Sequence, residues 1–150
     1  MRRDLMDRLL AARPDYHHET LSKAKAADLL HRSLGLVFPH FSSGPSTRTG
    51  LLAIAEHVEA NLRELLSAVG IEDLRAGQVI EHYFEAVEGV AAALQQDAAF
   101  IVSGDPAARS LDEVVLAYPG FFAIAAYRIA HVLYLQRVPI LPRLITEHAH

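Results

Sequence analysis

Hydrophobic residues recur every three to four positions along most of this chain, which is the spacing of a buried helix face. The clearest stripe runs through about residues 48–69, and a second runs through about residues 75–102. Only the short link Gly70–Leu74 separates them. We therefore predict two long helices that pack against each other in antiparallel orientation.

Less regular segments precede this pair. Residues 20–34 have helical spacing, and Gly35 is the expected end of that helix. Residues 37–50 concentrate proline, glycine and serine, so they are predicted to form a loop and are the best candidate for a hinge. No segment alternates between apolar and polar residues for long enough to predict a strand, and no internal repeat occurs.

A break follows the pair at Asp105-Pro106, because the residue before a proline is driven away from helical angles. Ser110 and Glu113 then form a capping-box pattern, which begins a short helix. A further helix over residues 119–136 and a last short one toward His148 complete the chain. The predicted fold is an all-α bundle of about six to eight helices.

The chain is long enough for one domain with a sizeable core, and 51% of its residues are hydrophobic. We divide this domain into three parts. Residues 1–45 hold N-terminal helices and a loop, residues 46–104 hold the long helix pair, and residues 105–150 follow the break.

Charge is distributed unevenly along the chain. Residues 1–45 carry seven Lys or Arg against five Asp or Glu, residues 46–105 carry three against ten, and residues 106–150 carry four against three. No basic stripe is present, and the middle segment is strongly acidic. Nucleic acid and anionic membranes are therefore not expected as partners.

Three further observations concern location. The longest apolar stretch, 121–135, contains Arg128 and His131 and is shorter than the roughly 20 residues that span a bilayer. The N-terminus has no apolar run of signal-peptide length. Cysteine is absent, which excludes disulfides and thiolate chemistry. We expect a cytoplasmic protein that does not enter a membrane.

Motifs for common chemistry are missing. The nine histidines are scattered, and no two of them stand four apart beside a glutamate, so no metal site is predicted. Gly35, Gly70 and Gly104 lie where helices are expected to end, and no cluster of glycines forms a phosphate-binding loop.

Three residues are candidates for function. Arg128 and His131 stand three apart on an apolar helix and therefore share a face. Arg128 is interpreted mainly as a structural arginine paired with Asp112 or Glu113, and alternatively as an interface or substrate contact. Asp105 lies at the break, where it either caps the following turn or binds a ligand.

The last third of the chain resembles bacterial serine O-acetyltransferases. Five short elements carry the resemblance, in one order and at close spacing. They are Asp105-Pro106-Ala107-Ala108, Tyr118-Pro119-Gly120, Ala126-Tyr127-Arg128-Ile129-Ala130-His131, Val138-Pro139 with Pro142-Arg143, and Thr146-Glu147-His148-Ala149-His150. The preceding helices resemble that family only by length and pattern.

The resemblance implies an N-terminal helical domain that precedes a left-handed β-helix, assembled as trimers or as dimers of trimers. Members of the family move an acetyl group from acetyl-CoA to the hydroxyl of L-serine, the first step of cysteine biosynthesis. Asp105 matches the aspartate with which the helical domain contributes to serine binding, and an acidic group suits the substrate ammonium.

The other functional parts of the family are expected beyond position 150. They are the histidine and aspartate of the general base, the acetyl-CoA site, and the tail that docks on O-acetylserine sulfhydrylase. By this resemblance the chain has no catalytic residue and binds no cofactor, and His148 and His150 belong to a linker.

Three interpretations remain open. The chain is part of an enzyme and supplies oligomer contacts and one serine-binding carboxylate. It is instead a helical assembly module that touches no ligand and forms a dimer, a trimer or a dimer of trimers. It is, last, an unrelated helical scaffold that resembles the family by chance.

Overall fold

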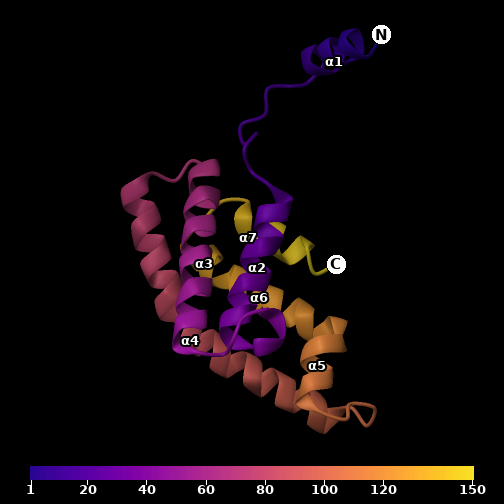
Figure 1. The fold of residues 1–150 in the computed structure, drawn as a ribbon, viewed down its shortest axis with the longest axis vertical. Helices are drawn as coiled ribbons and strands as arrows, with labels where there is room; N and C mark the ends of the chain where they lie inside the picture. The colour runs from indigo at the N-terminus through magenta and orange to yellow at the C-terminus, as the bar shows by residue number, and fades with distance from the viewer.

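The computed structural model describes residues 1–150 and contains helices but no strands, so the all-α prediction is confirmed. Figure 1 shows a bundle from which the N-terminal helix projects. The helices, in chain order, are α1 (Arg2–Ala11), α2 (Lys23–Val37), the 3₁₀ turn η1 (Pro39–Phe41), α3 (Arg48–Ala68), α4 (Asp73–Gly104), α5 (Leu111–Ala117), α6 (Pro119–Leu135) and α7 (Leu141–Glu147).

The two longest helices, α3 and α4, form the predicted pair and run antiparallel on one side of the bundle (Figure 1). The Thr47 hydroxyl caps α3 by accepting a hydrogen bond from the Gly50 amide at 3.2 Å. Gly70 then turns the chain with a φ of 83°, a conformation that favours glycine. The pair matches the prediction within a few residues at each end.

Helix α2 begins and ends three residues later than predicted, and Gly35 does not end it. The helix continues to Val37, and Phe38 closes it directly before Pro39. Gly35 is buried, and a Cβ there would lie 3.3 Å from the carbonyl oxygen of Phe41. The glycine therefore permits the close return of η1 against α2 and is not a helix stop.

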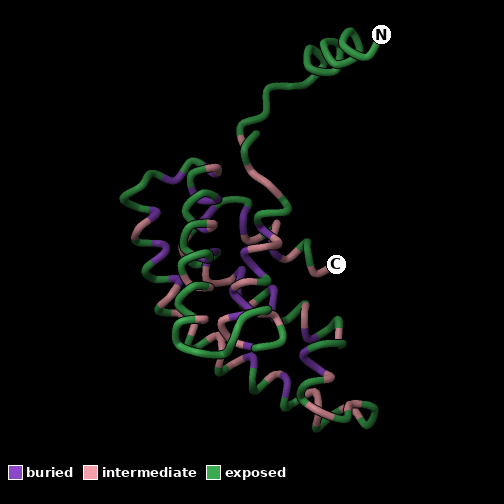
Figure 2. Tube along the Cα trace, in the orientation of Figure 1, coloured by how far each residue is buried: buried purple, intermediate pink, exposed green.

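The core centres on α6, which contacts α2, α4, α5 and α7. Purple segments in Figure 2 mark this buried interior, where the inner faces of the helices meet. Two hydroxyls lie inside this core: the Ser33 hydroxyl donates to the Leu29 carbonyl, so the Tyr83 hydroxyl donates to Ser33. Burial raises the pKa of Tyr83 to about 12.

Helix α1 has no buried residue and lies apart from the bundle (Figures 1 and 2). Residues 12–22 connect it to α2. No single helix of the chain has the length and apolarity needed to cross a membrane. Only α5 and α6 taken together have that length and apolarity, and the pair is bent by 75° where the two helices meet.

Candidate functional site

The candidate site is at the break after α4, and this break is where the sequence predicts it. Helix α4 ends at Gly104, and Asp105 takes an extended conformation, with φ −107° and ψ 110°, before Pro106. The chain then turns within a few residues, and the Ala108 amide donates to the Asp105 carbonyl at 3.0 Å. Asp105 therefore stands at a corner of the fold and not on a smooth helix face.

Two neutral groups hold the Asp105 carboxylate. Its Oδ1 accepts a hydrogen bond from the Ala107 amide at 2.8 Å, and its Oδ2 accepts one from the Tyr118 hydroxyl at 3.0 Å. The first bond is the turn-capping contact considered for this residue. No Lys, Arg or His forms an ion pair with Asp105. The carboxylate thus has no cationic partner within the chain, and each oxygen has a further lone pair for a ligand.

Helix α5 brings Tyr118 to this carboxylate. The Ser110 hydroxyl accepts a hydrogen bond from the Glu113 amide at 3.1 Å, as the capping-box pattern predicts. The reciprocal bond differs from the prediction, because Glu113 accepts from the Arg109 amide at 2.8 Å and not from that of Ser110. The helix ends at Ala117, so its last turn directs Tyr118 back to the start of the loop.

The phenol of Tyr118 has a raised pKa. Partial burial is the main cause, followed by the hydrogen bond to Asp105 and by the negative charges of Asp105 and Glu113. Tyr118 is therefore a stable donor toward Asp105 at neutral pH. The sequence showed this tyrosine only as part of the Tyr-Pro-Gly element, and its role as a donor was missed.

Arg128 is paired, but with a different acid from those predicted. Its guanidinium donates two hydrogen bonds to the Asp97 carboxylate on α4. One runs from Nε to Oδ2 at 2.6 Å, and the other runs from an Nη nitrogen to Oδ1 at 3.0 Å. These bonds are the main reason why the pKa of Arg128 is raised. Asp112 instead bonds to His40 at 2.7 Å. The predicted partners were wrong, because Glu113 also has another partner and accepts a hydrogen bond from the Arg109 amide.

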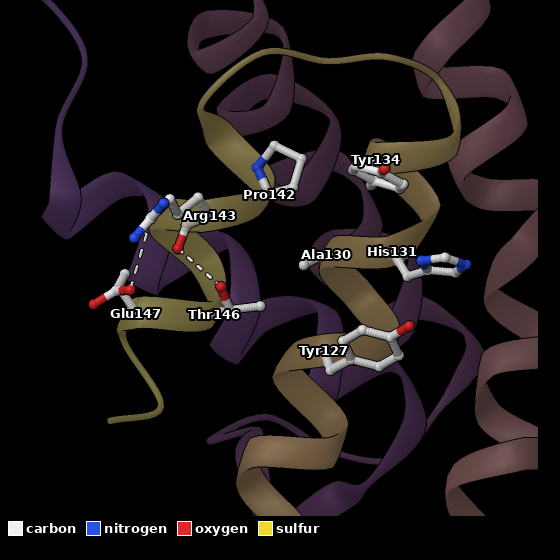
Figure 3. A pocket seen from close by; sticks show the side chains of 8 residues that line it. All are labelled: Tyr127, Ala130, His131, Tyr134, Pro142, Arg143, Thr146 and Glu147. Carbon is white, nitrogen blue, oxygen red and sulfur yellow. Dashed lines mark hydrogen bonds and ion pairs between the residues drawn. The ribbon is translucent and has the colours of Figure 1, made fainter.

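His131 belongs to an aromatic row on the exposed side of α6. Its ring stacks on Tyr127 with centroids 5.4 Å apart, and on Tyr134 with centroids 5.9 Å apart. The row lines an open groove of about 530 Å³, whose other wall is α7 with Arg143 and Glu147 (Figure 3). The spacing of the three rings along one helix face would have revealed the row from the sequence.

The three predicted residues do not form one constellation. No hydrogen bond or ion pair joins Asp105, Arg128 and His131, because each meets different neighbours. No group of three or more histidine, aspartate or glutamate side chains is placed to hold a metal ion. The closest histidine pair joins α2 to the end of α7, with the Nε2 atoms of His31 and His148 3.2 Å apart.

Curated proteins similar to this chain are serine acetyltransferases. One from Synechococcus elongatus is 51% identical over 54 residues, which are 36% of this chain and 22% of that protein. A plasmid serine acetyltransferase of the same organism is 33% identical over 95 residues, 63% of this chain and 29% of that protein. One from Bacillus subtilis is 48% identical over 54 residues, 36% of this chain and 25% of that protein. No family model matches the chain.

Solved structures with this fold are also serine acetyltransferases. Serine acetyltransferase 1 of Entamoeba histolytica, in complex with L-cysteine, has a TM-score of 0.75 at 26% identity over 93% of this chain and 50% of that chain. Serine acetyltransferase isoform 3 of that organism, in complex with cysteine, has a TM-score of 0.73 at 20% identity over 98% of this chain and 54% of that chain. An identity this low shows the fold alone. The chain thus spans about half the length of these structures and less than a third of the curated relatives' length.

Proposed function

This chain is homologous to serine acetyltransferases and has the fold of their helical domain; from this premise we propose that it is the helical domain of an enzyme that transfers acetyl from acetyl-CoA to L-serine. Residues 1–150 supply one substrate-binding carboxylate and contacts for assembly. The general base and the acetyl-CoA site lie in another part of the enzyme, so these residues alone do not catalyse the reaction. Cysteine biosynthesis is the pathway that this activity serves.

The observation that supports serine binding is the state of Asp105. Its carboxylate is held by an amide and a hydroxyl, and no protein cation neutralises it. A primary ammonium is the complement of such a group, because it carries a charge and three donors. Asp105 binds the ammonium of L-serine, and this contact orients the hydroxyl toward the acetyl donor. The turn-capping bond to Ala107 keeps the carboxylate in place for that task.

The test uses an acetyltransferase in which residues 1–150 are joined to their catalytic domain. Asp105→Asn keeps the size and the bond from Ala107 but removes the charge. We expect kcat/KM for serine to fall about 10- to 100-fold, since a hydrogen bond to a charged group contributes about 1.5–3 kcal/mol. The KM for acetyl-CoA should stay within about twofold, because Asp105 stabilises only the serine ammonium.

The matched control is Asp112→Asn, a nearby acid that bonds only to His40. Steady-state thiol release should give wild-type serine kinetics for this variant. Equal kinetics for Asp105→Asn and the wild type would reduce Asp105 to a turn cap. Serine-dependent turnover by residues 1–150 alone would contradict the proposal that the general base lies in another part of the enzyme.

A second function, assembly, is supported by the exposed side of α6. Ile124, Tyr127, Tyr134 and Leu135 are 37, 58, 66 and 61% exposed on a helix whose other side fills the core. A helix that is apolar on nearly all sides requires cover on nearly all sides. We propose that a further copy of the chain supplies this cover. Light scattering that shows only the 16.5 kDa mass of one chain would contradict this proposal.

A further inference from the structure

Helix α7 packs beside α2 (Figure 1), and two imidazole rings connect its end to that helix. Nε2 of His31, on α2, lies 3.2 Å from Nε2 of His148, the residue that directly follows α7. The ring centroids are 5.4 Å apart, and the ring planes are nearly perpendicular, at 76°. At this distance the contact is an N–H···N hydrogen bond, in which one Nε2 donates and the other accepts. These two residues are called the histidine pair below.

The histidine pair stands where four segments of the chain meet. The ring of Phe122, on α6, has its centroid 5.6 Å from that of His31 and 6.1 Å from that of His148. Phe41 of η1 joins the same cluster, 6.0 Å from His31. These apolar rings replace water on one side of the imidazoles, so a positive charge on His31 is less well solvated there than in open solvent.

The bond within the histidine pair is the only side-chain hydrogen bond that ties the turn after α7 to another helix. Leu141 and Ile145 are fully buried and keep the body of α7 in the core. The turn itself contains Ala149 and His150, whose amides donate to carbonyls of α7, and Ala149 packs partly against the core. Loss of the histidine bond would therefore loosen this turn and leave α7 in place.

The number of protons on the two rings decides whether this bond can form. With both rings neutral, or with one of them protonated, one Nε2 carries a hydrogen and the other has a free lone pair. With both rings protonated, every ring nitrogen carries a hydrogen, so no acceptor remains, and two positive charges face each other at 3.2 Å. The second proton is therefore incompatible with the contact, whereas the first is not.

Charged groups on the surrounding elements do not remove this conflict, because nearly all of them are paired with other side chains. The pairs are Asp28 with Arg32 on α2, Glu64 of α3 with Lys25, His40 of η1 with Asp112 of α5, and Glu147 with Arg143 on α7. Helix α6 contributes the uncharged Phe122, and His150 follows in the same turn. Burial and the charge of His148 lower the pKa of His31, and the opposing effect of Asp28 is smaller.

We propose that the histidine pair is an acid-sensitive contact, which holds the turn after α7 against α2 near neutral pH and releases it when both rings are protonated. Because burial penalises a charge on His31, His148 takes the first proton and donates to His31. The second proton, on His31, breaks the bond. The folded chain binds this proton less tightly than the unfolded chain does, so the free energy of unfolding falls as the pH drops below 6.5.

The proposal rests neither on serine binding nor on the exposed side of α6. Its test is an NMR titration of the complete chain from about pH 8 to about pH 4.5, with EDTA present so that no metal ion bridges the rings. The ring signals of ¹⁵N-labelled histidine follow the two protonation steps of the pair, and the heteronuclear NOE of the Ala149 amide reports whether the turn is held. We expect this NOE to stay high through the first step and to fall in the second. A turn that loosens in the first step, or in neither, would overturn the proposal.

Glutamine substitutions separate the protons from the contact. His31→Gln and His148→Gln each leave an amide that donates or accepts a hydrogen bond but does not take up a proton. In either variant the NOE of Ala149 should therefore stay high in acid. The matched control is His57→Gln, because His57 bonds only to the Ala53 carbonyl of its own helix. This variant should lose the held turn in acid as the wild type does. The same loss in His31→Gln and His148→Gln would overturn the proposal.

The titration of His31 itself provides a second readout. In His148→Gln the pKa of His31 should rise only part of the way toward 6.5, because the charge of His148 is removed while burial, the larger cause, remains. In Asp28→Asn the pKa of His31 should fall further, because this variant removes the charge that favours the protonated ring. Opposite shifts in the two variants support the proposal. An unchanged pKa of His31 in His148→Gln would show that the rings do not interact, and would overturn it.

Discussion

Two aspartates close to each other along the chain have opposite surroundings. Asp97, on α4, accepts two hydrogen bonds from the Arg128 guanidinium, and the opposite charges of the two side chains neutralise each other. Asp105, just after α4, accepts one bond from an amide and one from a hydroxyl, and its charge is not compensated. Both carboxylates are partly buried. They differ in the charge of the donor, not in the number of bonds.

This difference separates a structural acid from an acid that is available to a ligand. The Arg128 guanidinium occupies both oxygens of Asp97 and neutralises its charge, so the role of Asp97 is to hold α6 against α4. Neutral donors orient the Asp105 carboxylate without neutralising its negative charge. A cationic ligand would therefore be attracted by the whole of that charge. Hydrogen bonds alone therefore do not indicate that a carboxylate is occupied.

The largest expected effect concerns stability and Asp97. Arg128→Met keeps much of the apolar stem but leaves the Asp97 carboxylate, 22% exposed, without its cation. We expect a loss of about 2 kcal/mol in the free energy of unfolding, below the cost for a fully buried pair because both side chains retain some solvent. Urea denaturation followed by circular dichroism measures it.

The matched control is Arg63→Met, which removes an exposed pair with Glu59 on α3. It should cost about 0.5 kcal/mol or less. A loss of equal size in the two variants would remove the distinction between Asp97 and an ordinary surface acid.

A smaller effect is expected at Asp105 from the loss of its hydroxyl donor. Tyr118→Phe removes one neutral bond and leaves the charge, so it should raise the KM for serine about three- to tenfold, with kcat nearly unchanged. The effect should be smaller than that of Asp105→Asn in the same assembled enzyme. If Tyr118→Phe instead lowers the rates for serine and acetyl-CoA together, the tyrosine serves the fold and not the carboxylate.

The smallest expected effect is a shift in the titration of Tyr118. Because the Asp105 charge contributes to its raised pKa, Asp105→Asn should lower that pKa, and Asp97→Asn should leave it unchanged. The folded state holds this phenol proton more tightly than the unfolded chain does, so stability falls as the pH rises above 10.0. NMR of ring-labelled tyrosine follows the titration, and equal shifts in both variants would contradict a specific contact.

The sequence allowed the break at Asp105 and the Ser110 cap to be predicted, because both depend on neighbouring residues. The roles of Asp97 and Tyr118 could not be predicted in the same way. Asp97 and Arg128 stand 31 positions apart, and Asp105 and Tyr118 stand 13 apart. Which acid meets which donor depends on how α5 and α6 fold back along α4, and hydrophobic spacing does not describe that path.

The sequence by itself determined that this protein is helical, where α3, α4 and α6 run, and which family its last third resembles. These properties follow from periodic apolar residues, local caps and short motifs, which need no distant partner. Tertiary structure alone decided that Gly35 lies inside a helix, that Arg128 binds Asp97, and that α1 stands off the bundle with its apolar side exposed. The physical reason is that each of these depends on a contact, or on the lack of one, between segments that are far apart in the chain.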